Sequence, residues 1–99
     1  MSFLVRYTLK SADDRDEQIA AMEELVAGLK SEGIADLNYS CFSTDEATAF
    51  IGVLDFANDT AKQGFLDSAS FAAYRDRVTS ILSGPPSTEN IFPVASTHG

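Results

Sequence analysis

The sequence contains no tryptophan, one cysteine (Cys41) and one histidine (His98) among its 99 residues. A lone cysteine excludes an internal disulfide and any metal site that needs paired cysteines. The only histidine lies next to the C-terminus, where chains fray, so a catalytic dyad or triad built on histidine is not expected. No spacing resembles a calcium loop, and we expect no metal site.

Long apolar runs are also missing. No stretch approaches the ~20 residues that cross a bilayer, and the first ten residues lack the basic start and apolar run of a signal peptide. We therefore expect a protein of the reducing cytoplasm without a membrane span.

Basic residues are scarce. Seven Lys and Arg face fifteen Asp and Glu, which gives a net charge of −8. Binding to nucleic acid needs a stripe of lysine and arginine along the phosphates, and anionic membrane surfaces attract basic segments. The composition argues against both partners.

The length and composition favour a single folded domain over residues 1–99. Apolar residues make up 44% of the chain, which is ordinary for a globular protein. A domain of this size has a thin core, because it buries only about two thirds of its unfolded surface. A second subunit would enlarge the buried surface.

The first half of the chain shows strand, helix and strand patterns. Residues 3–10 alternate with period two, which predicts a strand. A helix follows, with Asp13 or Asp14 as its cap and Gly33 at its end. Its inward stripe recurs every three or four residues and consists of Ile19, Met22, Leu25, Val26 and Leu29. Residues 37–42 predict a second strand.

The second half repeats the order strand, helix, strand. Residues 48–56 form an apolar run that predicts a central strand, and Gly52 within it marks a bulge or a close approach. Asn58 caps a short helix to Leu66, and Ser68 or Ser70 caps another whose apolar stripe reaches Leu82. Residues 91–94 predict a last strand, which Pro93 places at an edge.

The order β-α-β-β-α-β predicts a ferredoxin-like α+β fold, with a four-stranded antiparallel sheet and two helices on one face. The other face is apolar whichever parity points there: Leu4, Arg6 and Thr8 or Phe3, Val5 and Tyr7 on the first strand. An apolar face in water marks an interaction site. We therefore expect a two-fold homodimer that packs through the open sheet face.

The segment VLDFANDTAKQGFLDSASFAAYRDRV carries a resemblance to a known family. An apolar strand ends in an aromatic residue, a capped helix follows, and a serine precedes a second helix with Phe and Tyr. In these features the chain resembles the antibiotic-biosynthesis-monooxygenase-like (ABM) domains of the dimeric α/β-barrel superfamily. The resemblance spans nearly the whole chain and implies a dimeric α/β barrel.

The resemblance also implies a range of functions. Some members of this family are cofactor-independent monooxygenases of anthrones, quinols or related phenols, others degrade haem, and many have no known activity. The family's strand-ending tryptophan falls at Phe56, its histidine or tryptophan nine residues later at Phe65, and the axial histidine of haem-degrading members at about Arg75. Their strand-one asparagine falls near Val5. Without an imidazole at Arg75, haem degradation is not expected.

The resemblance therefore implies a small-molecule-binding protein that needs no cofactor, with a cofactor-free monooxygenase of a phenolic or quinol-type substrate as the first interpretation. A non-catalytic ligand-binding or dimerisation domain and an isomerase of a small hydroxylated acid remain alternatives.

Family members hold a small apolar or aromatic substrate between sheet and helices. By analogy the expected substrate-binding residues are Tyr7, Asn38, Tyr39, Phe56, Phe65, Tyr74 and Arg75. Arg6 or Arg75 would supply positive charge, and Tyr7 or Tyr74 a hydrogen bond. The competing interpretation is that the aromatic residues only build the core. Cys41, in mid-strand, is expected to be a buried, unreactive thiol.

Overall fold

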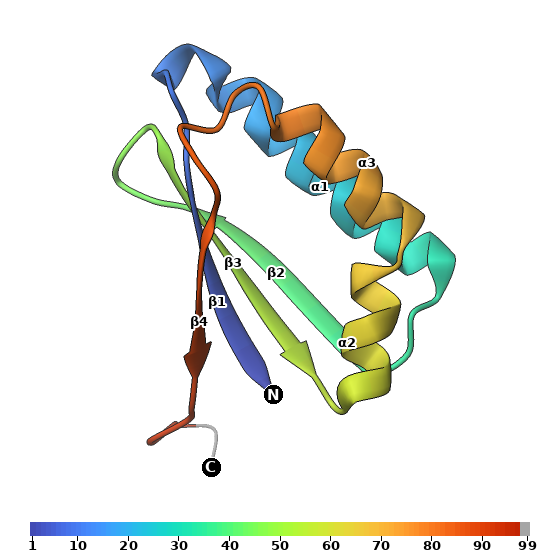
Figure 1. Cartoon of the computed structure of the whole chain (residues 1–99). Coiled ribbons are helices and arrows are strands. Elements are labelled where there is room, and N and C mark those ends of the chain that lie inside the picture. Colours follow the sequence, from blue (N-terminus) through green and yellow to red (C-terminus); the bar gives the residue numbers. More distant parts are fainter. Residues whose placement is uncertain (98–99) are drawn as a thin grey trace.

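The computed structural model describes residues 1–97, and His98 lies outside the described residues. Its element order confirms the predicted ferredoxin-like fold and the predicted short helix that precedes the last long one (Figure 1). The elements are β1 (Ser2–Thr8), a 3-10 turn η1 (Ala12–Asp14), α1 (Arg15–Glu32), β2 (Leu37–Ser43), β3 (Ala49–Phe56), α2 (Asp59–Leu66), α3 (Ala69–Val78) and β4 (Ser87–Ile91).

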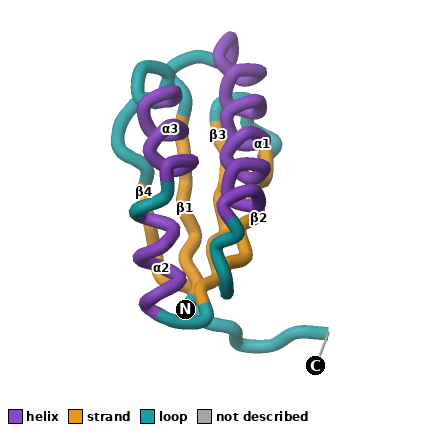
Figure 2. The backbone as a smooth tube through the Cα atoms, turned by 90° about the vertical axis from the view of Figure 1, so that its right-hand side faces the viewer, coloured by secondary structure: helices purple, strands orange, loops and turns teal. Residues whose placement is uncertain are grey.

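The four strands form one antiparallel sheet in the order β2-β3-β1-β4. The two central strands, β1 and β3, pair from Ser2 opposite Asp55 to Thr8 opposite Ala49. All three α-helices lie on the same side of this sheet, as the view in Figure 2 shows. No helix within residues 1–97 has both the length and the apolar character needed to cross a bilayer.

The prediction of a last strand over residues 91–94 is wrong. Strand β4 pairs Ser87 with Arg6 and Ile91 with Ser2, so it ends where the predicted strand begins. Its polar side chains hid it in the sequence, because an edge strand is held by backbone hydrogen bonds to a single neighbour. Pro93 lacks an N–H, so the strand ends before it. The predicted edge position is confirmed.

Three of the predicted helix ends are confirmed by their capping groups. The Asn58 side chain accepts from the Ala61 N–H, and the Ser68 side chain, rather than that of Ser70, accepts from the Phe71 N–H. Gly33 ends α1 in the left-handed conformation with φ 65°, which suits glycine.

Asp14 occupies the N-cap position of α1, one of the two predicted positions, but its side chain makes no capping bond. The side-chain bond at this end comes from Ser11, which accepts from the Asp13 N–H and opens the 3-10 turn η1. Helix α3 also ends earlier than its apolar stripe suggested. Beyond Val78 the chain forms a turn that places Leu82 beside Leu9.

Helices α1 and α3 lie close together at two points. The Glu32 carboxylate accepts from the N–H groups of Ala69 and Ser70 at 3.2 and 3.1 Å, which satisfies the first turn of α3. The Ser70 side chain and these N–H groups hold the pKa of Glu32 below its usual range. A Cβ added at Gly28 would lie 2.3 Å from the Ser70 Oγ, so only glycine allows this approach.

The structure shows which alternate side chains of each strand face the helices. Tyr7, Phe50, Leu54 and Phe56 point towards the helices and are buried. On the opposite face, Leu4, Ile51 and Val53 are half-buried and Phe42 is exposed. The core therefore lies between the sheet and the helices, and the open face keeps apolar side chains.

The Gly28–Ser70 contact predicts opposite effects for one substitution at two helical glycines. Gly28→Ala is expected to lower the free energy of unfolding by roughly 1–2 kcal/mol, because overpacking outweighs the gain in helix propensity. Gly64→Ala in α2 is the matched control, since its Cβ would lie 3.5 Å from Ile34. It is expected to be neutral or stabilising by up to about 1 kcal/mol. Urea unfolding measures both, and equal effects would contradict the close approach.

Candidate functional site

A cavity of about 460 Å³ lies between the sheet and helices α2 and α3. This size is typical of small-molecule sites. Strands β1, β3 and β4 provide one wall with Phe3, Val5, Tyr7, Leu54, Phe56 and Thr88. The helices and the turns provide the other with Lys62, Phe65, Leu66, Phe71, Tyr74, Arg75, Val78, Thr79, Leu82 and Pro86.

One end of this cavity, the phenylalanine end, is built by four rings in contact. The ring of Phe56 lies 5.8 Å from those of Phe3 and Phe65, and Phe65 lies 4.5 Å from Phe71, between ring centroids. The rings come from β1, β3, α2 and α3, so this end joins the sheet to both helices. It offers aromatic surface for a flat, apolar molecule.

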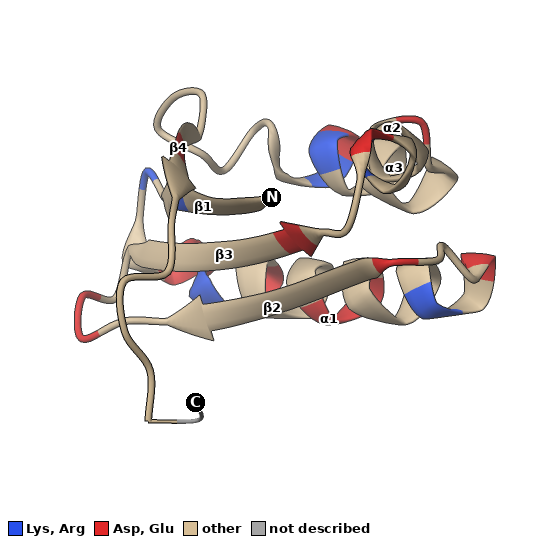
Figure 3. Ribbon diagram, turned by 90° about the horizontal axis from the view of Figure 1, so that it is seen from below, with Lys and Arg blue, Asp and Glu red and all other residues tan. Residues whose placement is uncertain are grey.

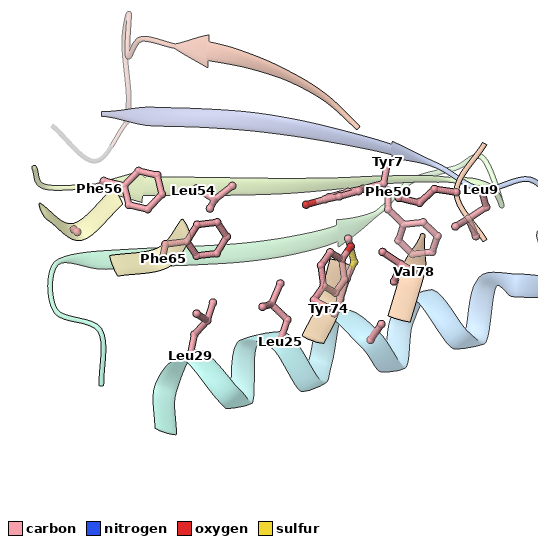
Figure 4. Close-up of a cluster of buried hydrophobic side chains, with 14 residues drawn as sticks. Tyr7, Leu9, Leu25, Leu29, Phe50, Leu54, Phe56, Phe65, Tyr74 and Val78 are labelled. Carbon is pink, nitrogen blue, oxygen red and sulfur yellow. The ribbon is translucent and has the colours of Figure 1, made fainter. Parts of the chain in front are cut away.

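The other end, the tyrosine end, is lined by two tyrosine rings. The rings of Tyr7 and Tyr74 meet edge to face with centroids 6.0 Å apart, and both line the cavity (Figure 4). Behind them, the Tyr39 hydroxyl lies 3.3 Å from the Tyr7 hydroxyl. A Cβ at Gly52 would lie 2.9 Å from the Tyr39 hydroxyl, which confirms the predicted close approach at this glycine.

Gln18 of α1 completes the tyrosine end. Its side chain is fully buried, and its Nε2 donates to the Tyr74 hydroxyl at 2.9 Å. Its Oε1 has no hydrogen-bond partner among residues 1–97. Such an orphaned oxygen is costly, so the Gln18–Tyr74 pair is maintained at some expense of stability.

Burial sets the protonation state of these groups. It raises the pKa of Tyr7, Tyr39 and Tyr74 above the ordinary tyrosine value. Burial also raises the pKa of the half-buried Cys41 thiol to about 11. At neutral pH the three hydroxyl groups and the Cys41 thiol therefore stay protonated. None of them acts as a base that could remove a proton from a substrate.

Two cations lie at the phenylalanine end. The Lys62 Nζ lies 4.9 Å from the centre of the Phe3 ring, and the Arg75 guanidinium lies 4.9 Å from that of Phe71. Neither has an ion-pair partner among the described residues. Figure 3 shows that acidic residues outnumber basic ones on the ribbon. Two basic residues on the wall of one cavity are therefore a distinctive feature of this chain.

A second hollow, a groove of about 710 Å³, runs between α1 and the edge strand β2. Its lining includes Ile19, Met22, Glu23 and Lys30 from the helix and Phe42 from the strand. It lacks both the wall of contacting rings and the Tyr7–Tyr74 pair, so the cavity beside α3 is the better candidate site. Within residues 1–97, no three His, Cys, Asp or Glu residues gather closely enough to hold a metal ion.

The structure brings most of the predicted site residues together. Tyr7, Phe56, Phe65, Tyr74 and Arg75 all line the cavity. Tyr39 lies behind Tyr7, stacked on Phe65 with centroids 5.8 Å apart.

The expected position of Asn38 is wrong, and of the two arginines offered as the positive charge only Arg75 lines the cavity. Asn38 is exposed and lies on the sheet face opposite the helices, since it alternates with Leu37 and Tyr39. Arg6 lies on the same open face, where its Nε is 3.5 Å from Glu89, so it supplies no charge to the cavity.

Sequence reasoning missed several residues of the site, among them Phe71 of the phenylalanine end. Gln18 reads as a polar helix residue, although it lies four residues before Met22 on the inward stripe. Lys62 precedes Phe65 by one helical turn, and this spacing placed it on the same face of α2. Phe3 shares its strand face with Tyr7, since residues four apart on a strand point the same way.

The Gln18–Tyr74 hydrogen bond predicts a coupling that a double-mutant cycle measures. Gln18→Leu and Tyr74→Phe each leave one buried polar group unpaired, which costs about 1–3 kcal/mol. The double variant removes both groups, so its cost is expected to fall short of the sum by about 1 kcal/mol or more. Urea unfolding gives the three values, with Gln63→Leu on the exposed side of α2 as a control. Additive costs would show that the hydrogen bond contributes nothing.

The structure was compared with known proteins. No protein-family model matches the chain, and no curated protein matches it. Several solved structures have a similar fold. Rv0793 of Mycobacterium tuberculosis has a TM-score of 0.80 at 13% identity, over 97% of this chain and 96% of that one.

Two further structures are named as candidate antibiotic biosynthesis monooxygenases. The one from Caulobacter crescentus has a TM-score of 0.81 at 16% identity, over 95% of this chain and 89% of that one. The one from Nitrosomonas europaea has a TM-score of 0.75 at 15% identity, over 90% and 94%. This chain therefore has the same fold as these ABM-like proteins, as the resemblance implied.

Proposed function

We propose that this chain binds a small, flat aromatic molecule in the cavity beside α3. The observation that carries the proposal is the gathering of four contacting phenylalanine rings and two tyrosine rings on the wall of one cavity. These rings provide a large aromatic contact surface for a flat ligand. Tyr7, Phe56, Phe65, Tyr74 and Arg75 are the proposed contact residues.

The names of the structures with the same fold suggest a monooxygenase, and the sequence resemblance implies cofactor-free oxygenation of a phenol or quinol. In this chemistry the ionised substrate passes one electron to dioxygen, the two radicals join as a peroxide, and loss of water leaves a carbonyl. Dioxygen is the oxidant. The protein would exclude water, orient the ring and stabilise the anion through Tyr7, Tyr74 and Arg75.

A second candidate function, binding without catalysis, is favoured by a specific observation. Burial keeps the three tyrosines and Cys41 protonated, and the cavity lining contains no carboxylate or imidazole among the described residues. The site therefore offers no side-chain base of its own to ionise a substrate. Only a substrate that ionises readily would react there.

Ligand binding predicts a rise in thermal stability. We expect 2-naphthol or anthrone to raise the melting temperature by roughly 10 °C at a hundred times its Kd, since binding adds about 2.7 kcal/mol. Thr88→Trp, which projects into the cavity, is expected to abolish the shift. Ser80→Trp, at an exposed position outside the cavity lining, is the matched control. Ligand-independent melting in the wild-type protein would contradict the proposal.

Oxygen uptake separates the two functions. An oxygenase consumes one dioxygen for each anthrone or reduced quinol converted, and Arg75→Gln is expected to slow this uptake. If anthrone raises the melting temperature without any uptake above the uncatalysed rate, the protein binds without catalysis.

We also propose that two copies of the chain pack through the open sheet face. Leu4 lies opposite Val53 and Phe42 opposite Ile51 in the pairing register, so these four side chains form one apolar patch. Phe92 and Val94, 79% and 97% exposed, extend beyond β4 and enlarge the apolar surface. A copy of the same patch is a self-complementary partner for it.

This assembly predicts that one charge on the patch yields monomers. Val53→Glu would bury an unpaired carboxylate in the interface and is expected to weaken dimerisation at least a hundredfold, or about 2.7 kcal/mol. Thr60→Glu, in the exposed first turn of α2, adds the same charge away from the patch. Sedimentation equilibrium measures both variants. A wild-type protein that remains monomeric at high concentration would refute the dimer.

A further inference from the structure

We propose that the ligand of this cavity carries an anionic group, such as a carboxylate, at one end of its aromatic body. The anion would lie between Lys62 and Arg75, and the other end of the aromatic body would pack against the rings of Tyr7 and Tyr74. This inference rests on the proposed binding function and narrows it to a class of ligand.

The cavity has two chemically different ends. Phe3 and Tyr7 line it from the same strand, four residues apart, which separates them by about 13 Å along β1. Phe56 and Phe65 gather towards the Phe3 end, and Tyr74 and Val78 towards the Tyr7 end (Figure 4). A ligand that fills the cavity along β1 therefore meets phenylalanine rings at one end and the rings of Tyr7 and Tyr74 at the other.

Both cations belong to the phenylalanine end. Lys62 lies over the ring of Phe3, at the end of β1 opposite to Tyr7. The Arg75 guanidinium turns back by one helical turn to lie over Phe71, which is itself in contact with Phe65. Both positive charges therefore lie at the phenylalanine end of the cavity.

These two cations are available to a ligand. Arg77, two residues after Arg75, is held by Glu17 and Glu24, and Arg6 by Glu89. Lys62 and Arg75 have no such partner among residues 1–97, and no carboxylate lines the cavity. In a chain of net charge −8, a cavity with two cations and no anion among its described lining residues favours an anionic ligand.

The residue types suit a carboxylate at a partly hydrated end. Lys62 is half-buried and Arg75 is exposed, so both keep contact with water and neither needs a buried counter-ion. An arginine binds a carboxylate through two parallel hydrogen bonds, and a lysine adds a point charge. The aromatic body of the ligand would pack against the rings of Phe56 and Phe65, which neither cation covers.

The test compares two probes of nearly the same shape. One is 6-hydroxy-2-naphthoate, which carries a carboxylate and a hydroxyl at opposite ends of a flat double ring. The other is its methyl ester, which is neutral at the first end. Isothermal titration of the full-length protein is expected to show roughly tenfold tighter binding of the acid, an advantage that shrinks with added salt.

Variants locate the effect. Lys62→Gln and Arg75→Gln are each expected to weaken binding of the acid severalfold and to leave binding of the ester unchanged. Lys10→Gln removes the same charge from a residue outside the cavity and is expected to change neither. Melting curves of the three variants check that each is folded.

The outcomes separate the two proposals. If the ester binds as tightly as the acid, the proposed binding function stands and the anionic ligand class is wrong. If the acid binds more tightly but Lys10→Gln weakens it as much as Lys62→Gln and Arg75→Gln do, the cations of the cavity are not the cause and the inference is overturned. If neither probe binds, both proposals fall.

Discussion

The edge-to-face packing of the Tyr74 ring of α3 on the Tyr7 ring of β1 joins α3 to the sheet, and the candidate site depends on this contact. Helix α3 is aligned on α1 by the Glu32 carboxylate at its first turn and by the close approach of Gly28 and Ser70. It reaches the sheet only through long side chains. The space that remains beside α2, between those side chains and the strands, is the cavity.

The same packing determines the chemistry of the cavity. Because the tyrosines are enclosed by apolar side chains, the pKa of each hydroxyl rises and each remains a hydrogen-bond donor at neutral pH. Positive charge enters only at the opposite end, where Lys62 and Arg75 lie over phenylalanine rings. Neutral tyrosines at one end and cations at the other suit recognition of an aromatic anion more directly than they suit proton abstraction.

The sequence predicted most of the fold, because strand alternation and helix caps are local signals. Asn58, Ser68 and Gly33 hold their elements through short-range contacts that residue type alone indicates. Strand β4 was not predicted at its true position because its side chains are polar and backbone hydrogen bonds to β1 hold it in the sheet. The open face could not be assigned from sequence, since both parities of the central strands carry large apolar side chains. The same uncertainty left Arg6 beside Arg75 as a candidate charge. Asn38 was placed in the site together with its neighbour Tyr39, although adjacent residues of a strand point to opposite faces. Gln18 was missed because its burial depends on a tertiary contact with Tyr74.

The most direct test of the account is fluorine NMR of protein labelled with 3-fluorotyrosine, titrated with 2-naphthol. The chain has three tyrosines, so three resonances report on the site. Our account predicts that the signals of Tyr7 and Tyr74, which line the cavity, shift most, and that the signal of Tyr39 shifts least because it lies behind Tyr7. Unchanged signals for Tyr7 and Tyr74 at saturating 2-naphthol would contradict the central claim that this cavity is the binding site.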